Sequence, residues 1–198
     1  MAWEVKKLGE VCIFKQGVQV PVKLQNENQK KGQIRFLRII DFTQGNVSPR
    51  FIDFPGEEHL INEDDVALVR YGASTGFVCR GLSGVLANNL FRIIPKSEKI
   101  LLKNYLFEYL NSSIFQKKIK DVVNGVAMPA ISFGLVKNMS ILLPSIEEQK
   151  LIVSKLDNIS EQIKQLENIY SQKLSCLEEL KQSILQKAFK GELIEVSA

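Results

Sequence analysis

The stretch P-S-I-E-E-Q-K-L-I-V-S-K-L-D-N-I-S-E-Q-I-K-Q-L-E-N-I-Y, residues 144–170, predicts the first part of one long helix. Pro144 fixes the approach of the chain, Ser145 can cap the first turn, and Glu148 three residues later completes a capping box. No helix breaker follows before Gly191. We therefore expect a helix of about 45 residues, on the order of 65–70 Å long.

Apolar residues form a seam along this helix. Their spacing of four and three residues is typical of coiled coils, with a phase slip near Lys173. A globule of roughly 145 residues is only about 30 Å across, so it is too small to cover the whole seam. We expect the seam to bind a second long helix, from another copy of the chain or from a different protein; a helix lying across its own domain is the alternative. The predicted seam residues are Ile152, Leu156, Ile159, Ile163, Leu166, Tyr170, Leu174, Leu177 and Ile184.

Charge divides the chain into two parts. Residues 145–198 hold 7 Lys and Arg against 9 Asp and Glu, whereas residues 1–144 hold 19 against 13, a net charge of +6 that includes all six arginines. This division predicts a basic domain that binds a polyanion and a helical region that serves assembly. A net charge of +6 is also ordinary for a soluble domain, so charge alone leaves nucleic-acid binding open.

Several classes of protein lack their characteristic residues here. The three cysteines include no CxxC pair and His59 is the only histidine, which predicts neither structural zinc nor disulfides and favours a reducing cytoplasm. No apolar run of 18 residues and no secretory leader occur, which predicts no membrane span and no secretion. The carboxylates of residues 63–65 are adjacent, so at the start of a strand they would point apart instead of converging on a metal. A methyltransferase would need a glycine-rich cofactor loop after a strand and an Asn/Asp-Pro-Pro-aromatic box, and neither occurs in the sequence. We therefore expect no catalysis in this chain.

Residues 1–144 combine strands and helices. Clusters of β-branched and aromatic residues predict strands over residues 34–40, 47–54, 66–71 and 85–95, with a tight turn in Y-G-A-S-T-G, residues 71–76. A helical stretch follows over residues 101–123, with a bend at residues 111–113. The order predicts an α+β fold, in which a mixed-strand globular domain precedes a long coiled-coil-forming helix.

Five segments resemble the DNA-specificity subunit of type I restriction-modification systems. Their order and spacing over nearly the whole chain carry the resemblance, above all P-x-x-E-x-Q-x-x-I at residues 144–152 and F-x-G-E-L at residues 189–193. Two segments depart from the family. Gly17 and Pro21 lie one residue further apart than in its Gly-x-x-Pro-like motif, and N-G-V-A-M-P, residues 124–129, replaces a loop that often carries threonine and glutamine. The five segments are W-E-V-K-K-L-G-E-V (3–11), N-E-D-D-V-A-L-V-R-Y-G-A-S-T-G-F-V (62–78), A-N-N-L (87–90), I-L-L-P-S-I-E-E-Q-K-L-I-V-S-K-L-D (141–157) and L-K-Q-S-I-L-Q-K-A-F-K-G-E-L (180–193).

The resemblance implies a half-size specificity subunit. The family's usual subunit has two target recognition domains and two helical spacers, and this sequence holds one of each: residues 1–144 as the domain and residues 145–198 as the spacer. It implies that the chain is a complete half-size subunit and not an arbitrary fragment. Two copies are expected to form an antiparallel homodimer through the long helix and to read double-stranded DNA in the cytoplasm. It also implies methyltransferase modification subunits that bind the helix, and a restriction subunit joined through the complex. S-adenosylmethionine, ATP and Mg are then expected in those partners and no cofactor in this chain. The alternatives are a non-catalytic coiled-coil adaptor and a DNA-binding fragment of a longer specificity subunit.

Reading a DNA sequence needs side chains that bind base edges in the major groove, with basic residues on the phosphates. Each candidate has an alternative role: Arg38 can pair with Asp41, the asparagines can be turn residues, and the lysines can be a solvated helix face. The candidates for phosphate contact are Lys117, Lys118 and Lys120. The candidates for base or groove contact are Gln19, Lys23, Arg38, Arg70, Tyr71, Ser74, Thr75, Asn88, Asn89, Asn124 and Met128.

Overall fold

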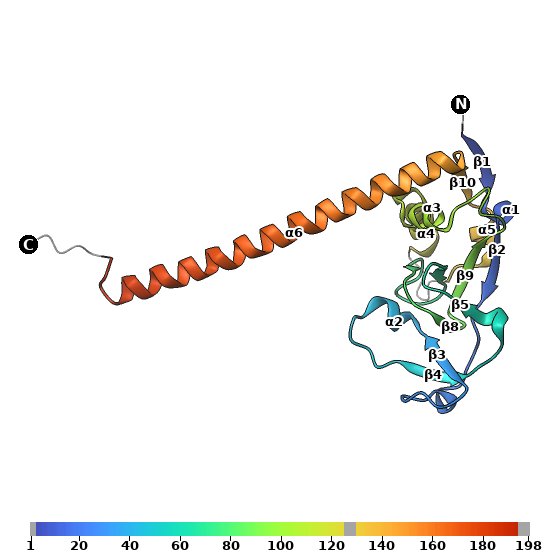
Figure 1. Ribbon diagram of the computed structural model, residues 1–198, viewed down its shortest axis with the longest axis horizontal. Helices are drawn as coiled ribbons and strands as arrows, with labels where there is room; N and C mark the ends of the chain where they lie inside the picture. Colours follow the sequence, from blue (N-terminus) through green and yellow to red (C-terminus); the bar gives the residue numbers. More distant parts are fainter. Residues whose placement is uncertain (1–2, 125–129, 194–198) are drawn as a thin grey trace, which may run out of the picture. The chain divides into compact units, whose positions relative to one another are not determined.

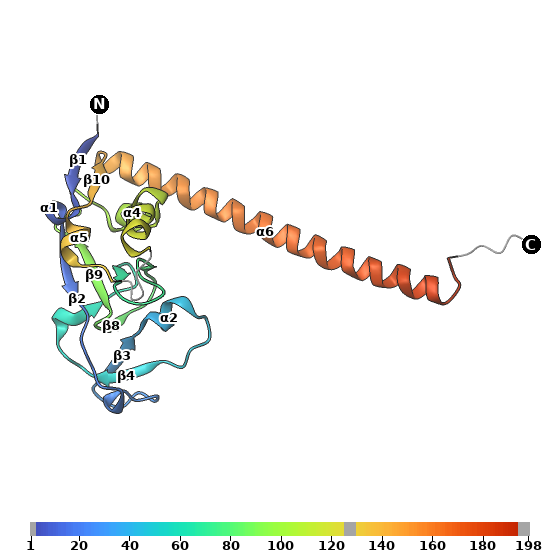
Figure 2. The same cartoon turned by 180° about the vertical axis from the view of Figure 1, so that it is seen from behind.

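The computed structural model describes residues 3–124 and 130–193 (Figures 1 and 2). Contacts divide the chain after Val153 into two compact units. The first, called the head here, runs to Val153, and the second begins at Ser154. The head ends nine residues beyond the border expected at residue 144, because the first turns of the long helix bury Gln149 and Val153 against it.

The described part of the head contains three β-sheets. In the smallest, β1 (Glu4–Lys7) pairs antiparallel with β10 (Ser140–Leu143), so the first and last strands of the head lie side by side (Figures 1 and 2). A second, fully antiparallel sheet has the order β2-β9-β6-β7. The third has the order β4-β3-β8-β5, in which only β3 and β8 are parallel. The remaining bounds are β2 Cys12–Gln16, β3 Gln33–Leu37, β4 Arg50–Asp53, β5 Leu60–Ile61, β6 Val66–Val69, β7 Val78–Cys79, β8 Gly84–Leu86 and β9 Leu90–Pro95.

Helices join and cover these sheets, which confirms the predicted α+β class. The predicted bend in the helical stretch falls at Ser112, whose hydroxyl accepts the Phe115 amide at 3.3 Å and so starts a new helix. Two short 3₁₀ turns occupy Val22–Leu24 and Glu57–His59. The helices are α1 (Leu8–Val11), α2 (Ile39–Thr43), α3 (Lys103–Asn111), α4 (Ser113–Val123), α5 (Phe133–Lys137) and α6 (Ile146–Phe189).

Strand β6 separates two hydrophobic cores. Val66 and Leu68 face the core shared with α3, α4 and α5, whereas Ala67 and Val69 face the core shared with β3 and β8. All four side chains are buried, since neighbouring residues of a strand point to opposite faces of the sheet. This explains why V-A-L-V is an unbroken apolar run.

One strand prediction is wrong at its end. Residues 34–37 belong to β3, but Ile39 and Ile40 begin α2 instead of continuing the strand. The side chain of Asp41 accepts the Arg38 amide at 2.7 Å, which caps the first turn of this helix. The local hydrogen bond therefore overrides the β preference of the two isoleucines.

Helix α6 starts with the predicted capping box: the Ser145 amide donates to the Glu148 carboxylate at 2.9 Å, and the Glu148 amide donates to the Ser145 hydroxyl at 3.3 Å. The helix continues for 44 residues, about 66 Å at 1.5 Å per residue. Gln149 is fully buried, and its amide donates to the Ile100 and Pro144 carbonyls at 2.8 and 3.0 Å. Its oxygen accepts the Leu102 amide at 3.0 Å, so every hydrogen-bonding group of this side chain is used to hold the helix to the head.

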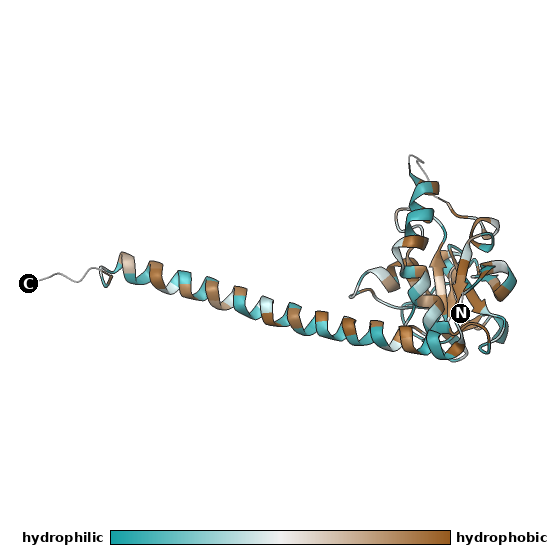
Figure 3. Ribbon diagram, turned by 90° about the horizontal axis from the view of Figure 1, so that it is seen from above, coloured by the Kyte–Doolittle hydropathy of each residue, from teal (hydrophilic) through white to brown (hydrophobic). Residues whose placement is uncertain are grey.

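Apolar positions recur along α6 beyond the head, as the brown bands of Figure 3 show. The predicted seam residues from Leu156 to Ile184 are exposed by 37–68%. Ile152 differs from them, because it packs partly buried against the core of the head. Counting along the chain, five seam residues lie seven positions apart, whereas Leu174 falls outside this repeat beside Lys173, where the slip is expected. These five are Leu156, Ile163, Tyr170, Leu177 and Ile184.

Candidate nucleic-acid interface

An open cleft of about 660 Å³ lies in the head and is called the cleft below. Five segments line it: the loop after β2, the junction of β3 with α2, the start of β4 at Arg50, residues 71–74, and the loop between β8 and β9. The structure thus brings together residues that are up to 70 positions apart in the chain. Six of the predicted contact residues line the cleft: Gln19, Arg38, Tyr71, Ser74, Asn88 and Asn89.

Close backbone contact holds the loop after β2 against the loop between β8 and β9. The Gly17 amide donates to the Leu90 carbonyl at 3.0 Å, and the Gln16 side chain donates to the Asn88 carbonyl at 3.0 Å. A Cβ at Gly17 would lie 2.2 Å from the Ala87 carbonyl oxygen, so only glycine allows this approach. The two loops that carry Gln19 and Asn88 are therefore fixed to each other.

The turn that carries Tyr71 and Ser74 is held against α4. Gly76 has φ +89°, its amide donates to the Val69 carbonyl at 2.9 Å, and its carbonyl accepts the Gln116 side chain at 3.0 Å. The Thr75 hydroxyl donates to the Gly72 carbonyl at 2.6 Å within the turn. Thr75 is not among the residues that line the cleft, and its hydroxyl stabilises the turn instead.

The two arginines of the cleft are paired within the head. Arg38 forms a bidentate ion pair with Asp41, at 2.9 and 3.1 Å, and donates to the Ser48 carbonyl at 2.8 Å. This is the alternative role expected for Arg38. Arg50 lies 2.8 Å from Glu27. Both guanidinium groups are thus oriented before any ligand binds, and part of their charge is already neutralised.

Arg70 lies beside the cleft and is not among its lining residues. Its guanidinium carbon is 4.8 Å from the centre of the Tyr71 ring and 4.9 Å from that of Phe133, and its Nε donates to the Ile131 carbonyl at 3.2 Å. Its backbone amide donates to the Asn89 carbonyl at 2.8 Å. Arg70 therefore connects the two loops that carry Tyr71 and Asn89 and holds the tyrosine ring in place.

The cleft also contains unsatisfied and unexpected polar groups. The Oδ1 atom of Asn89 is buried and accepts no hydrogen bond from any described residue. Gln25 and Arg50 line the cleft but were not predicted, since Gln25 begins a polar stretch typical of a solvated loop and Arg50 lies in a predicted strand. Gln25 donates to the Val20 carbonyl at 2.9 Å, and this bond shapes the loop. The loop after β2 pairs with β4 at Asn26 and Phe51, and only this long-range pairing reveals that Gln25 and Arg50 both lie at the cleft.

The other described residues that were predicted are not among the residues that line the cleft. Lys117, Lys118 and Lys120 are exposed on α4, whose opposite side buries Phe115 and Ile119. Lys23 is exposed in the first 3₁₀ turn, and Asn124 is exposed at the end of α4. Met128 lies outside the described residues. The lysines form a charged face on the helix that supports the turn at Gly76.

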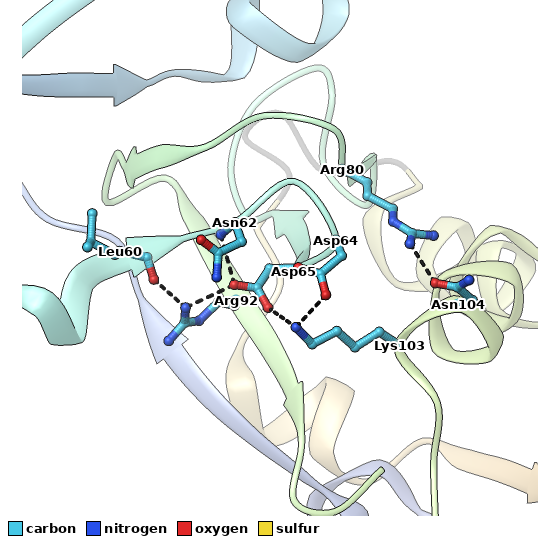
Figure 4. Close-up of polar contacts among 8 residues, drawn as sticks. All are labelled: Leu60, Asn62, Asp64, Asp65, Arg80, Arg92, Lys103 and Asn104. Carbon is cyan, nitrogen blue, oxygen red and sulfur yellow. Dashed lines mark hydrogen bonds and ion pairs between the residues drawn. The ribbon is translucent and has the colours of Figure 1, made fainter. Parts of the chain in front are cut away.

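The acidic residues before β6 form a structural network (Figure 4). Lys103 bridges Asp64 and Asp65 at 2.8 and 2.9 Å, and Asp65 also accepts from Arg92 at 3.2 Å and from the Asn62 amide at 3.0 Å. Burial favours a higher pKa for Asp65, but the Asn62 amide and the two cations outweigh it, so its pKa lies below the ordinary value. Within residues 3–124 and 130–193, no cluster of three or more His, Cys, Asp or Glu side chains could hold a metal ion.

The head presents a cleft lined by hydrogen-bonding groups, and the long helix presents an exposed apolar seam. None of the described helices has the length and apolar character needed to cross a membrane. The sequence profile of the type I restriction modification DNA specificity domain matches residues 1–174. The chain therefore belongs to the family of type I restriction-modification specificity subunits, and the resemblance inferred from its motifs is confirmed.

Similar proteins are about twice as long or longer. The type I restriction enzyme MjaVIII specificity subunit of Methanocaldococcus jannaschii is 24% identical over 187 residues, which are 94% of this chain and 42% of that protein. The EcoBI specificity subunit of Escherichia coli is 28% identical over 172 residues, covering 82% of this chain and 36% of its own length. The HsdS subunit from Thermoanaerobacter tengcongensis has a TM-score of 0.70 at 27% identity, covering 97% of this chain and 46% of that structure. The chain thus spans less than half of each relative.

Proposed function

We propose that the chain reads one half of a bipartite DNA target through the cleft. The convergence of six polar or aromatic side chains from separate segments is the observation that carries this proposal. Asparagine and glutamine amides can bind adenine with two hydrogen bonds, a serine hydroxyl can bind any base edge, and an oriented arginine suits guanine. In this proposal the head is the target recognition domain and α6 is the helical spacer.

The lysines supply the contacts that do not depend on sequence. Those of α4 are exposed, and α4 supports the turn at Gly76 whose first residues line the cleft. Three of the six arginines are ion-paired with carboxylates and two more are oriented by neutral groups of the head, so the exposed lysines are well suited to meet phosphates. Phosphate contacts of this kind fix the position of the protein on the duplex. These five arginines are Arg38, Arg50, Arg70, Arg80 and Arg92.

Assembly completes the proposed function. Two copies pair antiparallel through α6, which gives the two heads and two spacers that a specificity subunit twice this length would contain. Methyltransferase subunits bind the helices and supply S-adenosylmethionine and the methyl transfer, and a restriction subunit with ATP and Mg joins through that complex in the cytoplasm. The exposed seam and the length of the relatives support this proposal.

The test of DNA recognition starts with co-expression of the chain and a modification subunit, followed by sequencing of methylated bases. We expect methylation at a bipartite target with inverted, identical halves. Asn88→Ala should relax or abolish recognition at one position in each half, whereas Gln165→Ala on the exposed side of α6 should change nothing. A complex that methylates no DNA, and a chain that binds no duplex at low salt, would leave only the adaptor function.

The test of assembly is the mass of the purified chain by light scattering. We expect a dimer, and we expect the double variant Ile159→Asp with Ile163→Asp to have the mass of one chain, since both side chains are about half exposed on the seam. The head of the variant should keep its circular dichroism and its melting temperature, because both substitutions lie outside it. A dimer unchanged by the two charges would move the interface away from the seam.

A further inference from the structure

We propose that two copies of α6 pair in a single antiparallel register, in which Lys173 of each copy packs against the partner's Tyr170. This inference rests on the proposed homodimer and adds what selects its register. The seam repeats every seven residues, with Leu156, Ile163, Tyr170 and Leu177 in one row. Ile159, Leu166, Lys173 and Leu180 form the second row, three residues further along.

Antiparallel packing allows only a few registers. Successive seam residues are three and four positions apart in turn. In an antiparallel pair, the seam residues of the two helices lie level with one another only if the first row of one helix faces the second row of the other. Sliding one helix by a whole heptad preserves this match, so neighbouring registers differ by seven residues. The residue opposite Lys173 is therefore the partner's Leu156, the partner's Ile163, the partner's Tyr170, the partner's Leu177 or the partner's Ile184.

The chemistry of Lys173 selects among these registers. An ammonium group buried against leucine or isoleucine loses its hydration and gains no partner. Tyr170 offers the face of an aromatic ring and a hydroxyl, and within one chain the Lys173 ammonium already lies 5.8 Å from the centre of its own Tyr170 ring. The tyrosine of the partner lets the lysine stay charged at the seam. A single polar position of this kind is a known means of fixing the register of a coiled coil.

The length of the free helix selects the same register independently. With Lys173 opposite the partner's Tyr170, Ser154 lies level with the partner's Phe189. Ser154 is the first residue beyond the head and Phe189 is the last residue of α6, so the whole free helix is paired. Sliding toward Ile163 would bring the end of one helix level with residues 147–153 of the other, where Gln149 and Val153 are already buried in the head. Sliding toward Leu177 would leave a heptad of exposed seam at each end.

The register fixes the distance along the paired helices between the Val153 residues of the two copies, where each head ends and the free helix starts. Val153 of one copy lies level with residue 190 of the other, so the two Val153 positions are separated along the axis by 37 residues, or roughly 55 Å. This distance corresponds to about 16 base pairs of B-DNA. Two symmetry-related layers, each formed by one tyrosine and one lysine, would thus set the distance between the two half-sites.

Disulfide trapping of the full chain tests the register. Cys176 is exposed and is replaced by serine, whereas Cys12 and Cys79 stay in place, because burial raises the pKa of both thiols to about 12 and protects them from oxidation. In the proposed register Ile163 faces the partner's Leu180. The double variant Ile163→Cys with Leu180→Cys should form covalent dimers on oxidation, at least tenfold faster than the matched variant Leu156→Cys with Leu180→Cys, which reports the neighbouring register.

Four results would overturn the proposal in distinguishable ways. Faster cross-linking of the matched variant would show the wrong register, and cross-linking of Ile163→Cys alone would show parallel helices, since only then does a row face itself. A single-chain mass of the reduced protein would overturn the dimer itself and leave DNA recognition by the head untouched. Lys173→Leu should bring the cross-linking rates of the two cysteine pairs to within threefold of each other; a preserved tenfold preference would refute the role of Lys173.

Discussion

Replacing Gln149 by methionine tests how the head holds the long helix. The side chain is fully buried and makes three hydrogen bonds, to the Leu102 amide and to the Ile100 and Pro144 carbonyls. Methionine fills nearly the same volume, so the substitution removes the hydrogen bonds with little change in packing. Leaving buried backbone groups without partners costs about 1–3 kcal/mol each, and carbonyls find substitutes more easily than an amide. We expect a total loss of about 3 kcal/mol.

For a unit of this size, a loss of about 3 kcal/mol lowers the melting temperature by roughly 6–12 °C. Thermal unfolding followed by circular dichroism measures the shift. The matched control is Gln165→Met on the same helix, because Gln165 is exposed and donates only to Glu161 at 3.3 Å. If Gln149→Met melts within 2 °C of this control, the buried amide does not anchor the helix and the reasoning fails.

Three further predictions concern the head. Replacing the three exposed lysines of α4 by glutamine should reduce the slope of log K against log salt for duplex binding by about 2–3, because each phosphate contact contributes about 0.9; an unchanged slope in fluorescence anisotropy would remove the lysines from the interface. Asp65→Asn should lower the melting temperature at pH 7. Because the pKa of Asp65 is depressed in the folded state, the ionised carboxylate stabilises the fold at pH values above its ordinary pKa of 3.8. This stabilisation is lost as the pH falls through the folded pKa, so the melting temperatures of wild type and variant should converge below pH 3.8. Gly76→Ala would place a Cβ 2.5 Å from Ile119 at a positive φ and should cost about 2 kcal/mol in denaturant unfolding, whereas Gly45→Ala, with open space around it, should cost little.

The long helix could be predicted almost completely from the sequence. Its capping box, its uninterrupted length and its seam depend on residues three, four and seven positions apart, and such local spacing is visible in the chain. The same holds for the bend at Ser112, which is a local cap. The α+β class followed from the order of the elements. The spacing of apolar residues could not show that the head covers the start of the seam, where Ile152 packs against its core.

Only the tertiary structure decided which polar residues share a site. Gln19, Arg38, Tyr71 and Asn88 carry no sequence signal that relates them, yet backbone contacts at Gly17 and Gly76 bring their loops to one cleft. Arg70, predicted alongside them, is not a lining residue, and its guanidinium contacts the rings of Tyr71 and Phe133. The spacing that makes a helix and its seam involves residues close together in the chain, so the sequence by itself determined both. A cleft depends on long-range packing of separate strands, so the packing of the head determined the site.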